Sequence, residues 1–75
     1  MYEDIKPTVR IGKKGVNDAA VEEIRSQLRT RKIVKIKFLQ SADRGNMRQK
    51  AEELADMCGA TVEKVIGFTV ILRKK

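Results

Sequence analysis

Four short stretches of the chain alternate apolar and polar residues, which is the pattern of half-buried β-strands. The stretches are residues 8–11, 33–39, 61–66 and 68–73. In the second one, IVKIKFL, the side chains of Val34, Ile36 and Phe38 face one way and the intervening lysines face the other. The last two stretches meet at Ile66-Gly67, so we expect an antiparallel hairpin with a very tight turn.

Two segments between the predicted strands have apolar residues at helical spacing. Asn17 is placed to cap the first helix, acidic residues follow it, and arginines occupy its end, as the helix dipole favours. The expected core positions of this helix are Ala20 or Val21, Ile24 and Leu28. The second helix is capped by Asn46 or begins a turn earlier at Asp43, and Gly59 is its expected left-handed end. Its apolar stripe consists of Met47, Ala51, Leu54, Ala55 and Cys58.

The order strand, helix, strand, helix, strand, strand predicts an α+β fold, a two-layer α/β sandwich. Right-handed crossovers put both helices on one face of a mixed four-stranded sheet in the order 1-2-4-3. We expect a short flexible lead at residues 1–7, a single domain over 8–73 and a basic tail at 74–75. The sheet face without helices would carry Arg10, Lys35, Lys37, Lys64 and Arg73, interleaved with Ile33, Val62 and Ile71.

The charge of the chain is basic and unevenly distributed. Seventeen Lys and Arg against ten Asp and Glu give a net charge of +7 over 75 residues. Residues 6–37 carry ten basic and three acidic side chains, whereas residues 38–63 carry three basic and five acidic ones. In so small a domain this polarity favours a nucleic-acid partner. The alternative is a heavily charged surface of the thermophilic kind, although Glu usually balances Lys on such surfaces.

The composition excludes several kinds of chemistry. Histidine is absent and Cys58 is the only cysteine, so one chain can form no disulfide, no zinc site of Cys and His, and no His-dependent nucleophile. Cys58 lies on the apolar stripe, and we interpret it as a small buried hydrophobe. The acidic residues have the spacing of a solvated helix face, so we expect no enzyme activity and no cofactor or metal. Without a membrane-length apolar run or signal peptide, the expected location is cytoplasmic, with no membrane or small-molecule partner.

The stretch IGKKGVND, residues 11–18, joins the first strand to the first helix. Gly12 and Gly15 let the backbone approach a ligand closely, and Lys13 and Lys14 occupy the tip, as in a clamp for a phosphate backbone. A GxxG sequence arises often by chance, so its position between strand and helix is what gives it meaning. The acids early in the helix compete for its positive end. We therefore expect the lysines and glycine amides to hold a phosphate.

Four stretches together resemble one known family. They are IGKKGVND with EEIRSQL, then IVKIKF, then AEELADMCGA and finally VIGFTVILR, and they cover residues 8–73. In this combination the chain resembles the CRM domain, the chloroplast RNA splicing and ribosome maturation module, in its free-standing YhbY-like form. The resemblance implies the fold of the C-terminal domain of bacterial translation initiation factor three. It also implies RNA binding in assembly of the large ribosomal subunit, with the GKKG loop on the RNA backbone.

Two departures from the family pattern affect the expected binding. Family members usually begin with an additional helix, and residues 1–6 are too few for one of normal length. The last strand in the family often ends in Tyr-Arg, where this chain has Leu72-Arg73. The chain has only three aromatic residues, Tyr2, Phe38 and Phe68. Because two of these are expected in the core, we expect base stacking to contribute little.

The expected partner is RNA, in the form of ribosomal RNA or a pre-ribosomal particle, bound mainly through its phosphates. Lys13 and Lys14 would pair with phosphates, and basic residues elsewhere would extend the track. The full candidate set is Arg10, Gly12, Lys13, Lys14, Gly15, Arg25, Arg29, Arg31, Lys32, Lys35 and Lys37. The sequence does not determine the oligomeric state, and we expect a monomer.

Two alternative functions fit the same pattern. Archaeal Alba chromatin proteins, which bind DNA or RNA, resemble the chain in element order and in a lysine-bearing loop. Their long hairpin, however, does not match the tight turn expected at Ile66-Gly67. The other alternative is a protein-docking module of the ribosome, which would use an exposed apolar patch of Ile33, Val62 and Ile71.

Overall fold

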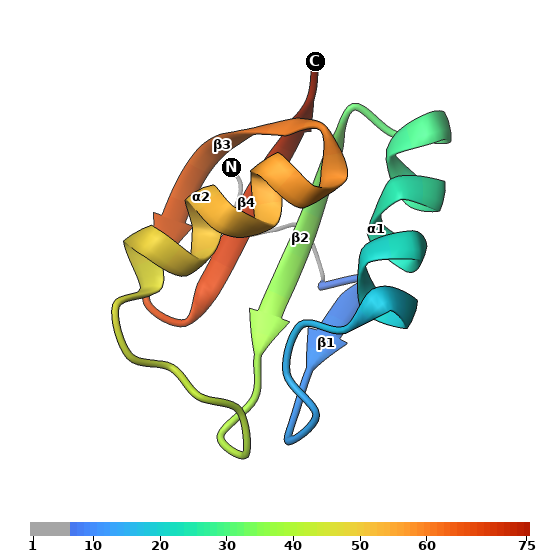
Figure 1. Ribbon diagram of the computed structural model, residues 1–75. Helices are drawn as coiled ribbons and strands as arrows, with labels where there is room; N and C mark the ends of the chain where they lie inside the picture. Colours follow the sequence, from blue (N-terminus) through green and yellow to red (C-terminus); the bar gives the residue numbers. More distant parts are fainter. Residues whose placement is uncertain (1–6) are drawn as a thin grey trace.

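The computed structural model of the chain describes residues 7–75 and contains six elements (Figure 1). They are β1 (Val9–Ile11), α1 (Asp18–Thr30), β2 (Ile33–Phe38), α2 (Met47–Cys58), β3 (Ala60–Ile66) and β4 (Thr69–Lys74). The order of elements is as predicted, and no strand end differs from its predicted position by more than one residue. The first residue of the predicted basic tail, Lys74, belongs to β4. The predicted lead, residues 1–7, lies outside the described residues except for Pro7.

The four strands form one mixed sheet in the order β1-β2-β4-β3, which confirms the predicted topology. β1 is parallel to β2, while β4 is antiparallel to both of its neighbours. Both helices lie on the same face of the sheet, in front of it in Figure 1. The opposite face is called the far face. The fold is therefore the predicted two-layer sandwich.

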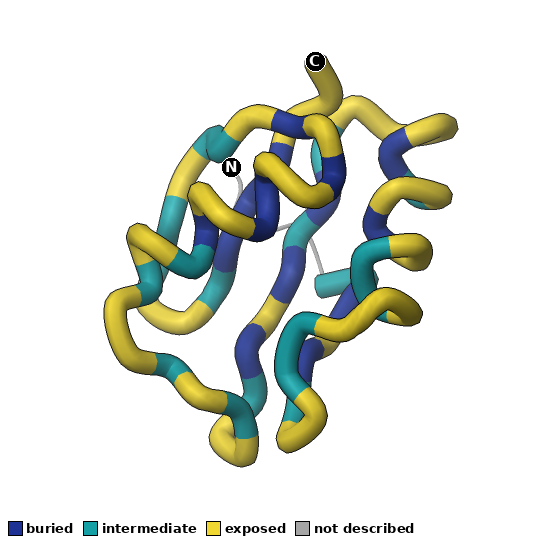
Figure 2. The backbone as a smooth tube through the Cα atoms, in the orientation of Figure 1, coloured by how far each residue is buried: buried dark blue, intermediate teal, exposed yellow. Residues whose placement is uncertain are grey.

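The core lies between the sheet and the two helices, where apolar side chains from both layers leave water. Buried residues recur at every second position along β1 and β2, as Figure 2 shows. The buried helix residues are Ile24, Leu28, Ala51, Leu54, Ala55 and Cys58. Among the described residues no polar or charged residue is buried. The predicted apolar stripes are confirmed, with Val21 and Met47 only partly buried at their edges.

Both helices begin at an asparagine cap, as predicted. The side-chain oxygen of Asn17 accepts a hydrogen bond from the backbone N–H of Ala20, 2.9 Å away. Asn46 accepts one from the N–H of Gln49 at 3.2 Å, so the start at Asn46 is correct and the earlier alternative is not. Gly59 ends α2 with a left-handed φ of 66°. Each cap satisfies backbone groups that the helix itself leaves unpaired.

The far face differs from the prediction in its apolar residues. A β-bulge between Val62 and Lys64 shifts the register of β3, so Val62 faces Leu72 and packs against the core. Ile71 does lie on the far face, yet it is 0% exposed. The predicted exposed patch of Ile33, Val62 and Ile71 is therefore wrong. The basic residues of this face are in their predicted positions: Arg10, Lys35, Lys37, Lys64 and Arg73.

The turn between β3 and β4 is two residues long but lies one residue later than predicted. Ile66 pairs with Thr69, so the turn consists of Gly67 and Phe68. Gly67 has a φ of 57°, and a glycine in that conformation at the first central position is typical of a type II′ hairpin turn. Phe68 is consequently 45% exposed, so the expectation that it is one of two aromatic residues in the core is wrong.

The helices of the described part of the chain include none that is both long and apolar enough to cross a membrane. Over residues 7–75 there is also no group of three or more Cys, Asp or Glu side chains that could hold a metal ion.

Candidate nucleic-acid interface

The loop between β1 and α1 is closed by a backbone hydrogen bond. The N–H of Gly15 donates to the carbonyl oxygen of Gly12 at 2.9 Å. Gly15 has a φ of 70°, in the left-handed region that glycine adopts without a steric penalty. This turn leaves Lys13 and Lys14 exposed at its tip. The two glycines thus shape the loop that presents the lysines.

The two glycines are needed for different reasons. A Cβ on Gly15 would have no atom within 4 Å, so only the backbone conformation requires glycine there. A Cβ on Gly12 would lie 3.3 Å from the hydroxyl oxygen of Ser41 and 3.8 Å from a methyl of Leu39. Gly12 therefore allows the loop to pack closely against the segment that follows β2.

The surface around the loop is a shallow, open depression of about 480 Å³. Arg10 from β1 and the two loop lysines contribute its positive charge, and Glu23 of α1 its negative charge. The side chain of Asn17 already caps the helix N-terminus beside the depression. A phosphate here would meet lysine ammonium groups first, because the helix end is already satisfied.

The far face continues the positive charge of the depression. Arg10 pairs in register with Lys37 on β2, and both are exposed. Lys35 lies two residues before Lys37 on β2, and it is half-buried and engaged in an interaction of its own. The structure therefore brings together Arg10, Lys37 and the loop lysines, and Lys35 is the least available of the predicted basic residues.

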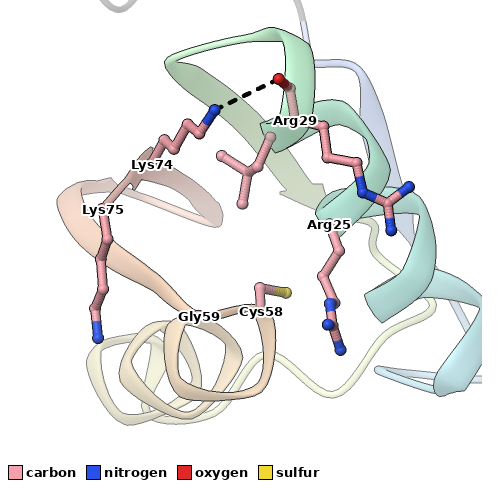
Figure 3. Close-up of a pocket in the computed structure, with 7 residues that line it drawn as sticks. Arg25, Arg29, Cys58, Gly59, Lys74 and Lys75 are labelled. Carbon is pink, nitrogen blue, oxygen red and sulfur yellow. Dashed lines mark hydrogen bonds between the residues drawn. The ribbon is translucent and has the colours of Figure 1, made fainter.

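A second group of predicted residues lines a basic pocket of about 360 Å³, which is shown in Figure 3. Arg25 and Arg29 come from α1, Lys74 is the last residue of β4, and Lys75 follows it. The ammonium of Lys74 donates a hydrogen bond to the carbonyl oxygen of Arg29 at 3.4 Å. A guanidinium nitrogen of Arg25 lies 3.8 Å from the carboxylate of Glu22. Both contacts are exposed, so all four cations can still meet an anion from solvent.

The basic pocket also contains Cys58, whose sulfur points into it (Figure 3). Burial raises the pKa of the Cys58 thiol, and the positive charge of Arg25 opposes this only in part. The thiol is therefore neutral at neutral pH, which agrees with the predicted role as a small core residue.

The candidate residues fall into two groups at opposite ends of α1. The loop adjoins the start of the helix, whereas the basic pocket adjoins its end (Figure 1). Arg31 and Lys32 follow α1 directly, and the carbonyl of Lys32 accepts a hydrogen bond from the N–H of Lys74. They belong to the second group and are exposed. The candidate track is thus not one continuous surface around the loop.

Sequence reasoning missed the part that Lys74 and Lys75 play in the basic pocket. Both lysines were recognised only as a basic tail. Their approach to Arg25 and Arg29 depends on how the last strand packs beside α1. Two basic pairs so far apart in the chain give no local signal of this meeting.

Comparison with known proteins gives the same family as the resemblance. The family model described as the CRS1 / YhbY (CRM) domain matches residues 1–74. The chain belongs to this family, which confirms the prediction from the sequence.

Two individual relatives support this assignment. The Bacillus subtilis (strain 168) protein named "Probable RNA-binding protein YqeI" is 30% identical over 71 residues, which are 95% of this chain and 73% of that protein. The solution structure of the hypothetical protein SAV1595 from Staphylococcus aureus, described as a candidate RNA-binding protein, superimposes with a TM-score of 0.81 at 26% identity. The match covers 97% of this chain and 75% of SAV1595.

Proposed function

We propose that this chain is a non-enzymatic RNA-binding protein that holds folded RNA by its phosphate backbone. The observation that carries the proposal is the GKKG loop, in which a closed two-glycine turn projects Lys13 and Lys14 into solvent. The description of two relatives as RNA-binding proteins supports the same partner. The net charge of +7 gives the attraction that such a partner requires.

The loop lysines are available to phosphates without breaking other contacts. Neither Lys13 nor Lys14 forms an ion pair with another described residue. Binding would release counterions from the RNA without the loss of an existing salt bridge. The shallow depression around the loop suits a strand lying across it better than an enclosed small molecule.

The basic pocket supplies a second region of positive charge at the other end of α1. Two separated phosphate-binding regions on one small domain favour an RNA that is folded, because such an RNA presents backbone in more than one direction. Phosphate contacts position the protein on the RNA, so most of the affinity would be independent of sequence.

We further propose that the RNA is ribosomal RNA or a pre-ribosomal particle, bound during assembly of the large subunit. This step rests on the family resemblance. Crosslinking in cells followed by identification of the attached RNA tests it directly. Crosslinks in precursors of large-subunit RNA are expected. Crosslinks that map elsewhere would refute the assembly role and leave RNA binding in place.

The structure disfavours both alternatives considered from the sequence. An Alba-like protein needs a long hairpin arm, and the β3–β4 turn has only two residues, Gly67 and Phe68. The protein-docking alternative needed an exposed apolar patch, and two of its three residues, Val62 and Ile71, pack away from solvent. Competition between a folded RNA and a DNA duplex of the same length would separate the Alba-like function from the proposed one.

A further inference from the structure

The hairpin turn presents an aromatic ring to solvent. Phe68 is 45% exposed, and Met57 on α2 is the other large apolar side chain described as exposed. The guanidinium carbon of Arg44 lies 3.8 Å from the centroid of the Phe68 ring, so the cation covers one face of it. An exposed ring held in this way is preorganised for contact with a further planar group.

The ring lies at the same end of the sheet as the GKKG loop. At the end of β2, the N–H of Phe38 donates to the carbonyl oxygen of Phe68, and the N–H of Leu39 donates to that of Ile11. The C-terminal end of β2 is therefore flanked by the hairpin turn on one side and by Ile11, the residue before the GKKG loop, on the other. Two strand spacings of about 4.8 Å put the backbone of Phe68 roughly 10 Å from the start of the loop. Figure 1 shows the loop and the turn at this same end.

The surroundings of the ring suit a nucleic acid. Arg44 stacks on the ring, and the loop that carries Lys13 and Lys14 lies at the same end of the sheet. Aromatic rings flanked by cations bind single-stranded nucleotides, since the bases stack while the phosphates are neutralised. A few nucleotides can span the distance between Phe68 and the GKKG loop, and one small domain commonly binds that many.

We infer that Phe68, backed by Arg44, is a stacking platform for an unpaired base of the RNA whose backbone the GKKG loop holds. The inference rests on the proposed function and adds a class of ligand to it. The ligand is a folded RNA that has an unpaired nucleotide, in a loop or bulge, beside the strand whose phosphates the GKKG loop binds. A fully paired RNA would engage only the phosphate contacts. The ring therefore gives the protein a preference among RNA structures.

The test uses the full chain and two RNAs of equal length, a hairpin with an unpaired 2-aminopurine and a fully paired duplex. Phe68→Leu keeps an apolar side chain of similar size but removes the aromatic ring. For this variant we expect roughly ten-fold weaker binding of the hairpin, and the ratio of hairpin to duplex affinity should fall by a similar factor. The fluorescence quenching of 2-aminopurine that stacking produces should be lost. Phe68→Tyr and Phe68→Trp should restore both.

The fluorescence readout separates a stacking platform from a ring that only anchors the segment carrying Arg44. A purely structural ring would leave the quenching and the affinity ratio of Phe68→Leu at wild-type values, and that result would overturn the inference. The proposed function would survive it if Lys13→Ala/Lys14→Ala still weakened binding of both RNAs. If the wild-type chain bound neither RNA, the proposed function and the inference would both fail.

Discussion

The carbonyl oxygen of Gly12 accepts a hydrogen bond from the N–H of Gly15, 2.9 Å away, and this bond closes the loop that carries Lys13 and Lys14. The loop is therefore a defined turn, and its shape depends on the left-handed backbone of Gly15. The proposed mode of RNA binding requires this shape, so the conformation of Gly15 has consequences that can be measured.

Gly15→Ala should lower the free energy of unfolding by about 1 to 2 kcal/mol, because an alanine resists the left-handed conformation. No steric clash adds to this effect, since nothing lies within 4 Å of the new Cβ. Gly15→Asn should cost less, as asparagine tolerates this region better. Urea denaturation of the wild type and of these two variants measures the free energies of unfolding. Gly45→Ala is the matched control, with a near-neutral effect, because its φ is not positive. Equal stabilities of the Ala and Asn variants would contradict this explanation.

The two asparagine caps should respond differently to substitution. Asn17 has an extended backbone, with a φ of −119°, whereas Asn46 is left-handed, with a φ of 48°. Asn17→Ala loses only its cap hydrogen bond, at a cost of about 1 kcal/mol. Asn46→Ala loses a cap and must also hold an unfavourable φ, so it should be the more destabilising variant. Asn46→Gly should recover most of that difference in urea denaturation. Equal costs for the two alanine variants would count against this account.

The raised pKa of Cys58 makes stability depend on pH in the alkaline range. Because burial raises the pKa, the folded state retains the thiol proton at a pH where the unfolded state has lost it. The stabilisation that the protonated thiol gives the folded state is fully present below the pKa that Cys58 has in the unfolded chain. It is lost as pH rises through the pKa that Cys58 has in the folded protein. The free energy of unfolding should therefore fall across this window, and Cys58→Ala should fall less steeply. Native Cys58 should also react with iodoacetamide far more slowly than Cys58 in urea. Equal reaction rates would show that the thiol is not protected.

The basic pocket can be tested separately from the loop. Arg25→Ala/Arg29→Ala should weaken RNA binding and flatten the dependence of log affinity on log salt by about two units. Stability should change little, because within residues 7–75 the only ion pair of these arginines is the exposed contact of Arg25 with Glu22. If these arginines only stabilise the fold, urea denaturation of the double variant will show a lower free energy of unfolding. The salt dependence of its RNA affinity will then equal that of the wild type, which would contradict the prediction.

Local rules sufficed for the helices and for most of the sheet. The caps and the stop at Gly59 depend on neighbouring residues in the chain, so the sequence predicted Asn17 and Gly59 correctly and gave Asn46 as one of two alternatives. The bulge beside Val62 could not be predicted, because an extra residue in one strand shows only when the partner strand is in place. Alternation likewise left the hairpin register open by one residue.

The candidate site was predictable only in part, for the same reason. The GKKG loop is a contiguous motif, and the structure forms it as a closed turn. The basic pocket joins residues from α1 with the end of β4, and only tertiary packing brings them together. Phe68 was expected in the core from the alternation of the last strand, but its position in a two-residue turn leaves the ring outside.

The most direct test of the account is the salt dependence of RNA affinity in Lys13→Ala/Lys14→Ala. Arg48→Ala is the control, because it removes a positive charge from an exposed position on α2, outside the proposed site. Loss of two phosphate contacts should flatten the log-log slope of the loop variant by about two units and weaken its binding of different RNA sequences to the same extent. The control should keep a slope close to that of the wild type. An unchanged affinity and slope in the loop variant would contradict the claim that the GKKG loop holds the RNA backbone.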